Sequence, residues 1–132
     1  MTPAAADPGG PSARQEDVTS TEQDLLTRAF SAYNAQDADG LLALVSDDVD
    51  WPNGSGRLRG KAALRAYWRD QWTRTRTHDQ PTAVHRRPDG RVAVRLIRVV
   101  QSLDGSVISR GTFHYVFRIK GPRIVCLDIE DA

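Results

Sequence analysis

The chain changes its hydrophobic period at Pro81. Before Pro81, apolar side chains recur at the spacing of one helix face. After it, apolar and polar residues alternate, which is the spacing of strands that bury one face. Helices followed by a run of strands predict an α+β fold, with the helices packed on one antiparallel sheet. The clearest helical stripe contains Leu25, Leu26, Ala29, Phe30 and Tyr33.

We expect three helices before this switch, near residues 20–36, 38–46 and 60–75. Ser20 and Gln23 fit a capping box, in which each side chain satisfies a backbone N–H group at the start of the first helix. Asp37 is a suitable cap for the second helix. A brief strand over residues 49–51 separates the second helix from the third.

The sheet is expected from residue 82 onward, with strands at 82–87, 91–103, 106–119 and 123–130. Asp104-Gly105 is a strong signal for a hairpin turn, because glycine and aspartate tolerate the backbone conformation of tight turns. Pro88-Asp89-Gly90 and Lys120-Gly121-Pro122 predict the other two turns. The strands should therefore form an antiparallel meander.

Length and charge restrict the classes of function. The 132 residues fit one domain, and 18 basic against 17 acidic residues leave a net charge of +1, which favours neither nucleic acid nor a membrane surface. Cys126 is the only cysteine, so no intramolecular disulfide forms. Residues 1–18 are rich in Pro, Ala, Gly and Ser and predict a disordered tail before a domain at 19–132. No apolar leader or membrane-length segment is seen, and we expect a cytoplasmic protein.

The run Tyr33–Trp68 has a characteristic order of elements. A helix ends, a short helix follows, Asp47-Asp48 stops it, a short strand reaches Trp51, and Arg59-Gly60-Lys61 opens a third helix. This order resembles the nuclear transport factor 2-like superfamily, also called SnoaL-like or ketosteroid isomerase-like. The resemblance implies a cone of three N-terminal helices packed on a curved antiparallel sheet around a hydrophobic pocket. It implies less about chemistry, because members range from isomerases to binders without catalysis.

His114 is the first candidate catalytic residue. Counted from the Asp104-Gly105 turn, it falls where ketosteroid isomerases place a protonated aspartate that binds the substrate oxygen. An imidazole there could donate a hydrogen bond or act as acid or base near neutral pH. The alternative is a half-buried structural histidine. If His114 faces the pocket, a row of large apolar residues faces outward and predicts a homodimer through the sheet. That row contains Phe113, Tyr115, Phe117 and Ile119.

Trp51 and Asn53 are candidates at the end of the short strand. Asn53 falls at the general-base aspartate of the isomerases, but an amide cannot accept a proton there. Ala29 replaces their oxyanion-hole tyrosine. Trp51-Pro52-Asn53 is similar to the aromatic-x-Asn of limonene-type epoxide hydrolases, for which Asp128 would supply the last-strand aspartate. The Arg-x-Asp pair of those hydrolases is missing, because the long strand reads Arg95-Leu96-Ile97-Arg98.

Four further residues are candidates for ligand contact. Arg95 and Arg98 lie on opposite faces of one strand, so one of them should face the cone and suit a carboxylate or enolate. Tyr33 and Tyr67 lie on helical stripes, where they form core or wall the pocket. His78 and His85 lack a second ligand at metal spacing, so we expect no metal, and no motif indicates a cofactor.

Two main functions remain open. One is a small-molecule enzyme of isomerase or cyclase type, which moves a proton on an apolar carbonyl or ring substrate through His114, Asn53 and Asp128. The other is a binding module with the same pocket and no catalysis. An epoxide hydrolase-like enzyme and an interaction protein that uses the outer sheet face are further alternatives. An ionised carboxylate inside the pocket would favour an enzyme, and the sequence offers only Asp128 and Asp131 for that role.

Overall fold

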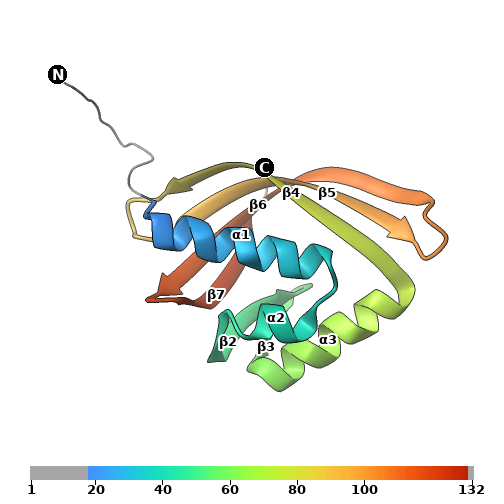
Figure 1. Ribbon diagram of the computed structural model, residues 1–132, viewed down its shortest axis with the longest axis horizontal. Coiled ribbons are helices and arrows are strands. Elements are labelled where there is room, and N and C mark those ends of the chain that lie inside the picture. Colours follow the sequence, from blue (N-terminus) through green and yellow to red (C-terminus); the bar gives the residue numbers. More distant parts are fainter. Residues whose placement is uncertain (1–17, 131–132) are drawn as a thin grey trace.

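A computed structural model describes residues 18–130 of the chain. Three helices pack on the concave side of a curved six-stranded sheet, as Figure 1 shows. The predicted α+β class is confirmed. Residues 1–17 of the expected tail lie outside the described residues. The elements are α1 (Ser20–Asn34), α2 (Ala38–Leu42), β2 (Val45–Asn53), β3 (Gly56–Arg59), α3 (Lys61–Arg74), β4 (Thr75–Arg86), β5 (Val92–Ser102), β6 (Val107–Lys120) and β7 (Arg123–Glu130).

The helix starts follow from local capping. α1 begins one residue earlier than the predicted capping box: Thr19 accepts from the backbone N–H of Glu22, and the Glu22 carboxylate accepts from that of Thr19. A carboxylate in the first turn also suits the helix dipole. Asp37 caps α2 through the N–H of Gly40, as predicted. Both caps lie where the sequence has short polar side chains before an apolar run.

The sheet is larger than predicted. Its strand order is β3-β2-β7-β6-β5-β4, and all neighbours are antiparallel except β2 and β7, which are parallel. The expected start of the sheet at residue 82 is wrong, because β4 begins at Thr75, directly after α3. α2 is shorter than predicted and β2 longer, and β3 forms at residues 56–59, where no strand was predicted. The charged and glycine-rich sequences of these segments do not predict strands. They form strands because of pairing partners that are distant along the chain.

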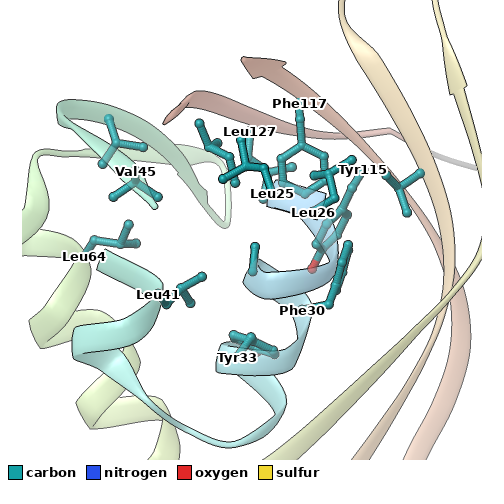
Figure 2. Close-up of a cluster of buried hydrophobic side chains, with 14 of the residues drawn as sticks. Leu25, Leu26, Phe30, Tyr33, Leu41, Val45, Leu64, Tyr115, Phe117 and Leu127 are labelled. Carbon is teal, nitrogen blue, oxygen red and sulfur yellow. The ribbon is translucent and has the colours of Figure 1, made fainter. Parts of the chain in front are cut away.

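The inner face of the sheet, defined here as the face that contacts α1, is aromatic. Phe30 on α1 lies 6.5 Å from the ring of Tyr115 and 6.1 Å from that of Phe117. Figure 2 shows these side chains meeting between the helix and the sheet. Phe113 and Ile119 pack against the same core. The prediction that this row faces outward is therefore wrong, and with it the reason given for a homodimer through it.

Two bulges decide which side chains face inward. On β4, Pro81 pairs with Leu96 and Ala83 with Arg95, so Thr82 is an extra residue. On β6, one extra residue lies between the partners of Val100 and Gln101. An extra residue reverses the alternation of faces beyond it. A count along either strand from one side of its bulge therefore assigns the wrong face on the other side.

Candidate functional site

A small cavity lies between α1 and the inner face of the sheet. Its volume is about 30 Å³, which is room for one or two water molecules. Its walls come from both helices and sheet, and all but one of its lining residues are apolar or aromatic. The lining residues are Ala29, Phe30, Tyr33, Leu41, Trp51, Asp79, Tyr115 and Phe117. The single carboxylate of this wall makes the cavity a candidate site.

That carboxylate belongs to Asp79, whose exposed fraction is 2%. Asp79 on β4 pairs directly across the ladder with Arg98 on β5. The guanidinium donates from Nε to Oδ1 and from Nη2 to Oδ2, each over 2.7 Å. Two parallel N–H bonds to a carboxylate fix both groups in one plane. Arg98 thus holds the buried Asp79 carboxylate in one orientation at the end of the apolar cavity that Asp79 lines, which is its polar end.

Arg98 is enclosed by aromatic rings. Its guanidinium carbon lies 5.6, 5.3 and 5.5 Å from the ring centroids of Tyr33, Phe113 and Tyr115. It also donates to the hydroxyl of Tyr115. Burial, the largest single cause, lowers the pKa of Arg98, but the hydrogen bonds to Asp79 and the charge interactions with Tyr115, Tyr33 and Asp79 together outweigh it and raise the pKa of the guanidinium above its usual value. Arg98 therefore stays protonated while it is largely removed from water.

Two tyrosines, Tyr33 and Tyr115, lie beside the Asp79–Arg98 pair. The Tyr33 oxygen accepts a 2.7 Å hydrogen bond from Nε2 of Gln71, which also donates to the Thr77 hydroxyl over 3.2 Å. The Tyr115 oxygen accepts from Arg98. Each phenol oxygen accepts one hydrogen bond and also carries one O–H donor of its own. Burial, the largest cause, raises the pKa of both tyrosines and keeps them neutral.

Asn34 fixes the backbone at the buried aspartate. Its side chain donates to the carbonyl of Asp79 and accepts from the N–H of Asp79, both over 2.8 Å. β4 is an edge strand, so its outer backbone groups have no strand partner there. The last residue of α1 takes the place of that partner and satisfies both groups. The carboxylate position is therefore set by α1 as well as by β5.

Several predicted ligand residues lie in or near this cavity. Tyr33 and Trp51 line it. Arg98 faces the inside, and Arg95 faces the outside, which answers the question that the alternating pattern left open. Tyr67 is half-buried and packs against the core from α3 without lining the cavity.

The prediction that His114 lines the cavity is wrong. Tyr115 faces α1, and alternation puts His114 on the opposite, outer face between Arg95 of β5 and Glu130 of β7. The physical reason is the β6 bulge, where Ile108 is inserted between the Gln101–Val107 and Val100–Ser109 pairs. A count from the hairpin turn is then off by one residue. Among the described residues, His114 Nδ1 is buried without a hydrogen-bond partner.

Asn53 and Asp128 also lie away from the cavity. Asn53 ends β2 in an exposed hairpin opposite Gly56. Asp128 lies on the outer face, where it accepts from Arg57 and Arg91 over 3.0 and 3.2 Å. The strand that carries Asp128 puts Leu127 inward instead. The three predicted catalytic side chains therefore do not converge on one another at the cavity.

Asp79 and Gln71 are two polar residues of the site that were not predicted from the sequence. Thr77 and Asp79 alternate with exposed residues, which is a strand signal, but the nearby Pro81 argued for a break. Proline is tolerated here because β4 is an edge strand and because the bulge begins there. The period-2 spacing of Thr77, Asp79 and Pro81 was the one feature of the sequence that indicated a strand here.

Within residues 18–130, no group of three or more His, Cys, Asp or Glu side chains is arranged to hold a metal ion. Of the helices described, none has the length and apolar character needed to cross a membrane.

Comparisons with known proteins agree with this architecture. The profile of the SnoaL-like domain matches residues 26–127. A proposed polyketide cyclase from Sinorhizobium meliloti is 23% identical, with a TM-score of 0.70 and coverage of 81% of this chain and 94% of the other. An NTF2-like protein of unknown function from Burkholderia pseudomallei is 22% identical, with a TM-score of 0.72 and coverage of 85% and 91%.

A third structure is TerC co-crystallised with polyporic acid, at 20% identity and a TM-score of 0.72, covering 84% of this chain and 91% of the other. Comparison with curated proteins gave no match. Identities in this range establish a shared fold, and the chemistry of each relative stays with that relative.

Proposed function

The chain belongs to the SnoaL-like domain family of the nuclear transport factor 2-like superfamily, and on this premise we propose that it binds a small ring-shaped or carbonyl-bearing molecule in its inner cavity. We further propose an isomerase- or cyclase-type proton transfer on that molecule. Solved structures of the same fold include proposed polyketide cyclases and a protein crystallised with polyporic acid, which supports this class of ligand.

One observation carries the proposal: Asp79, which is ion-paired with Arg98, is the one charged residue among those that line an otherwise apolar cavity. Asp79 is among the most deeply buried polar groups of the described chain, yet it lines a space that α1, β2 and β6 enclose. Ligand sites commonly combine apolar walls with a few fixed polar groups. An ionised carboxylate in the pocket is also the feature that separates an enzyme from a passive binder of this fold.

The groups at the polar end suit proton removal beside a carbonyl. The Asp79 carboxylate would take a proton from the carbon next to the carbonyl, and the electron pair would move onto the carbonyl oxygen. The O–H groups of Tyr33 and Tyr115 would donate to the oxygen as it gains charge, which stabilises the transition state. Arg98 would hold the carboxylate in place, and Trp51 would pack on the ring of the ligand.

A binding module without chemistry is the second candidate. Both oxygens of Asp79 already accept from Arg98 at 2.7 Å, which lowers the freedom of the carboxylate to take a proton. The same pair would still orient a ligand hydroxyl, because each carboxylate oxygen has a second lone pair. This geometry favours recognition of a phenol or enol as strongly as removal of a proton.

The test uses 2-tetralone, a bicyclic ketone with acidic protons next to its carbonyl. NMR titration measures binding, and uptake of deuterium from D₂O at that carbon measures proton transfer. We expect saturable binding, and exchange that is slowed about 10²-fold or more by Asp79→Asn, as for loss of a catalytic base. Tyr33→Phe should weaken binding, and Arg95→Gln, on the outer face, should change neither.

Binding with no enzyme-dependent exchange would leave the binding module as the function. No binding of 2-tetralone or of related phenols to the folded protein would count against both candidates.

The homodimer and the cytoplasmic location stay predictions. The apolar surface that supports a dimer is at the tip of the β5–β6 hairpin, where Leu103, Val107 and Ile108 are 56–63% exposed. Light scattering at micromolar concentration tests the dimer, and Val107→Ser with Ile108→Ser should favour the monomer if this surface is used.

A further inference from the structure

The groove between α1 and β4 lies against the inner cavity. This groove has a volume of about 260 Å³ and is lined by Gln23, Leu26, Thr27, Phe30, Pro81 and Val84. Phe30 lines both spaces, since it also belongs to the wall of the 30 Å³ cavity. The Phe30 side chain is therefore common to the wall of the groove and the wall of the cavity.

The helix α1, which carries Phe30, is attached to β4 near both of its ends. At the start of α1, Glu22 pairs with Arg86 of β4. At the end of α1, Asn34 holds the backbone of Asp79 through two hydrogen bonds of 2.8 Å. The groove lies between these two attachments, beside the Pro81 bulge. α1 therefore cannot easily move away from the sheet, and the space can open only by movement of side chains.

Phe30 itself is held by contacts that a ligand could replace. Its ring stacks on Tyr115 with an interplanar angle of 23° and meets Phe117 edge-on at 84°. Figure 2 shows the ring extending from α1 beside Tyr115. If the Phe30 ring moves out of its place beside Tyr115 and Phe117, the slot that it leaves has one aromatic face and one aromatic edge. A flat ring fits such a slot and regains the same contacts.

We propose that Phe30 controls access from the α1–β4 groove to the cavity and limits the ligand to a flat ring that carries an oxygen. The ring replaces Phe30 between Tyr115 and Phe117, and its oxygen reaches the Tyr33 and Asp79 end. This inference rests on the proposed ligand site, and it adds the route and the ligand shape. It also accounts for a cavity too small for a substrate when Phe30 is in place, since ligand sites usually measure about 300–1,000 Å³.

The experiment compares Phe30→Leu with Phe117→Leu. Both substitutions remove part of an aromatic ring from the cavity wall, but only Phe30 also lines the groove. Phe30→Met is a second variant at the same position, for the case that leucine impairs folding. NMR exchange rates are measured on the methyl groups of Ala29 and Leu41 with two probes, benzene and 2-naphthol.

We expect Phe30→Leu and Phe30→Met to raise the association rate of both probes about tenfold, because a side-chain rearrangement before binding slows association. Phe117→Leu should enlarge the cavity and raise affinity with little change in that rate. Equal rates in wild type and both Phe30 variants, or equal acceleration by Phe117→Leu, would overturn the inference.

Benzene separates this inference from the proposed function, because it needs only the route and the space. Faster benzene exchange in the Phe30 variants, without tighter binding of 2-naphthol than of benzene, would support the route and contradict the polar ligand site. Tighter binding of 2-naphthol than of benzene, with no effect of the Phe30 variants on the exchange rates, would support the polar ligand site and contradict the route.

Discussion

The two faces of the sheet use the same residue types in opposite ways. On the inner face, the Asp79–Arg98 pair is buried among aromatic rings, and two parallel hydrogen bonds of 2.7 Å hold its two side chains together. On the outer face, arginines and carboxylates form a chain of half-exposed pairs, such as Arg57 with Asp128 and Arg87 with Glu130. The difference shows that burial, rather than composition, decides whether a charged pair is a site or a solvated surface.

The ion pairs on the two faces also differ in how much they contribute to stability. A buried pair has given up its hydration, so removal of one partner leaves an uncompensated charge. An exposed pair exchanges one solvated state for another and contributes little. Removal of the aspartate from the buried pair should therefore cost much more stability than removal of an aspartate from an exposed pair.

The largest expected effect is that of Asp79→Ala. It should lower the free energy of unfolding by about 3–5 kcal/mol, because Arg98 remains buried without its partner. Asp128→Ala, on the outer face, should cost roughly 1 kcal/mol or less. Chemical denaturation measures both. The double variant Asp79→Leu with Arg98→Met should recover much of the loss, and equal losses at the two aspartates would contradict the contrast between the faces.

Asn34→Ala should have the next largest effect. It leaves the N–H and C=O of Asp79 without partners, which costs about 1–3 kcal/mol for buried groups. Thr82→Ala removes a more exposed hydrogen bond, from the Thr82 hydroxyl to the carbonyl of Arg95, and is the matched control. Denaturation curves test the pair. A loss at Thr82 as large as that at Asn34 would show that the edge strand is held elsewhere.

Alkaline pH should destabilise the protein through its inner face. Burial raises the pKa of Tyr33 and Tyr115 above the ordinary value of 10.0. Above pH 10 the unfolded chain loses these protons while the folded chain keeps them, so the free energy of unfolding falls as pH rises. The contribution is complete below pH 10. Denaturation midpoints between pH 9 and 11 should fall less for Tyr33→Phe than for wild type; identical slopes would disprove the assignment.

His114→Ala should have the smallest effect on ligand binding. The imidazole lies across the sheet from the cavity, so we expect the affinity for 2-tetralone to change by less than about twofold, against a loss for Tyr33→Phe of about 0.5–1.5 kcal/mol, the value of one neutral hydrogen bond. Isothermal titration with each variant makes the comparison. A larger loss from His114→Ala than from Tyr33→Phe would place the ligand on the outer face.

Much of the fold could be predicted because its signals are local. The stripe of α1, the Asp37 cap of α2 and the turn at Asp104-Gly105 each depend on a few neighbouring residues. β3 and the first half of β4 could not be predicted in the same way. Their polar sequences become strands only because β2 and β5 are beside them.

The candidate site was predicted only in part. Tyr33 and Trp51 line the cavity, and of the two arginines between which the sequence did not choose, Arg98 lies on the inner face; their contact with a ligand stays a prediction. His114 was assigned to the wrong face by one residue of register, and Asp79 was overlooked beside Pro81. Both errors arise at β-bulges, which insert a residue without a mark that a single sequence makes plain.

The sequence by itself determined the α+β class, the Asp37 cap of α2, the turns, the family and the existence of two faces on each strand. Only the tertiary structure decided which face is inside, because that choice depends on bulges and on where α1 docks. It also decided that Asp79 and Arg98, 19 residues apart, meet in the interior of the protein. Periodicity is a property of neighbours along the chain, whereas burial is a property of neighbours in space, and the chemistry of this site follows from burial.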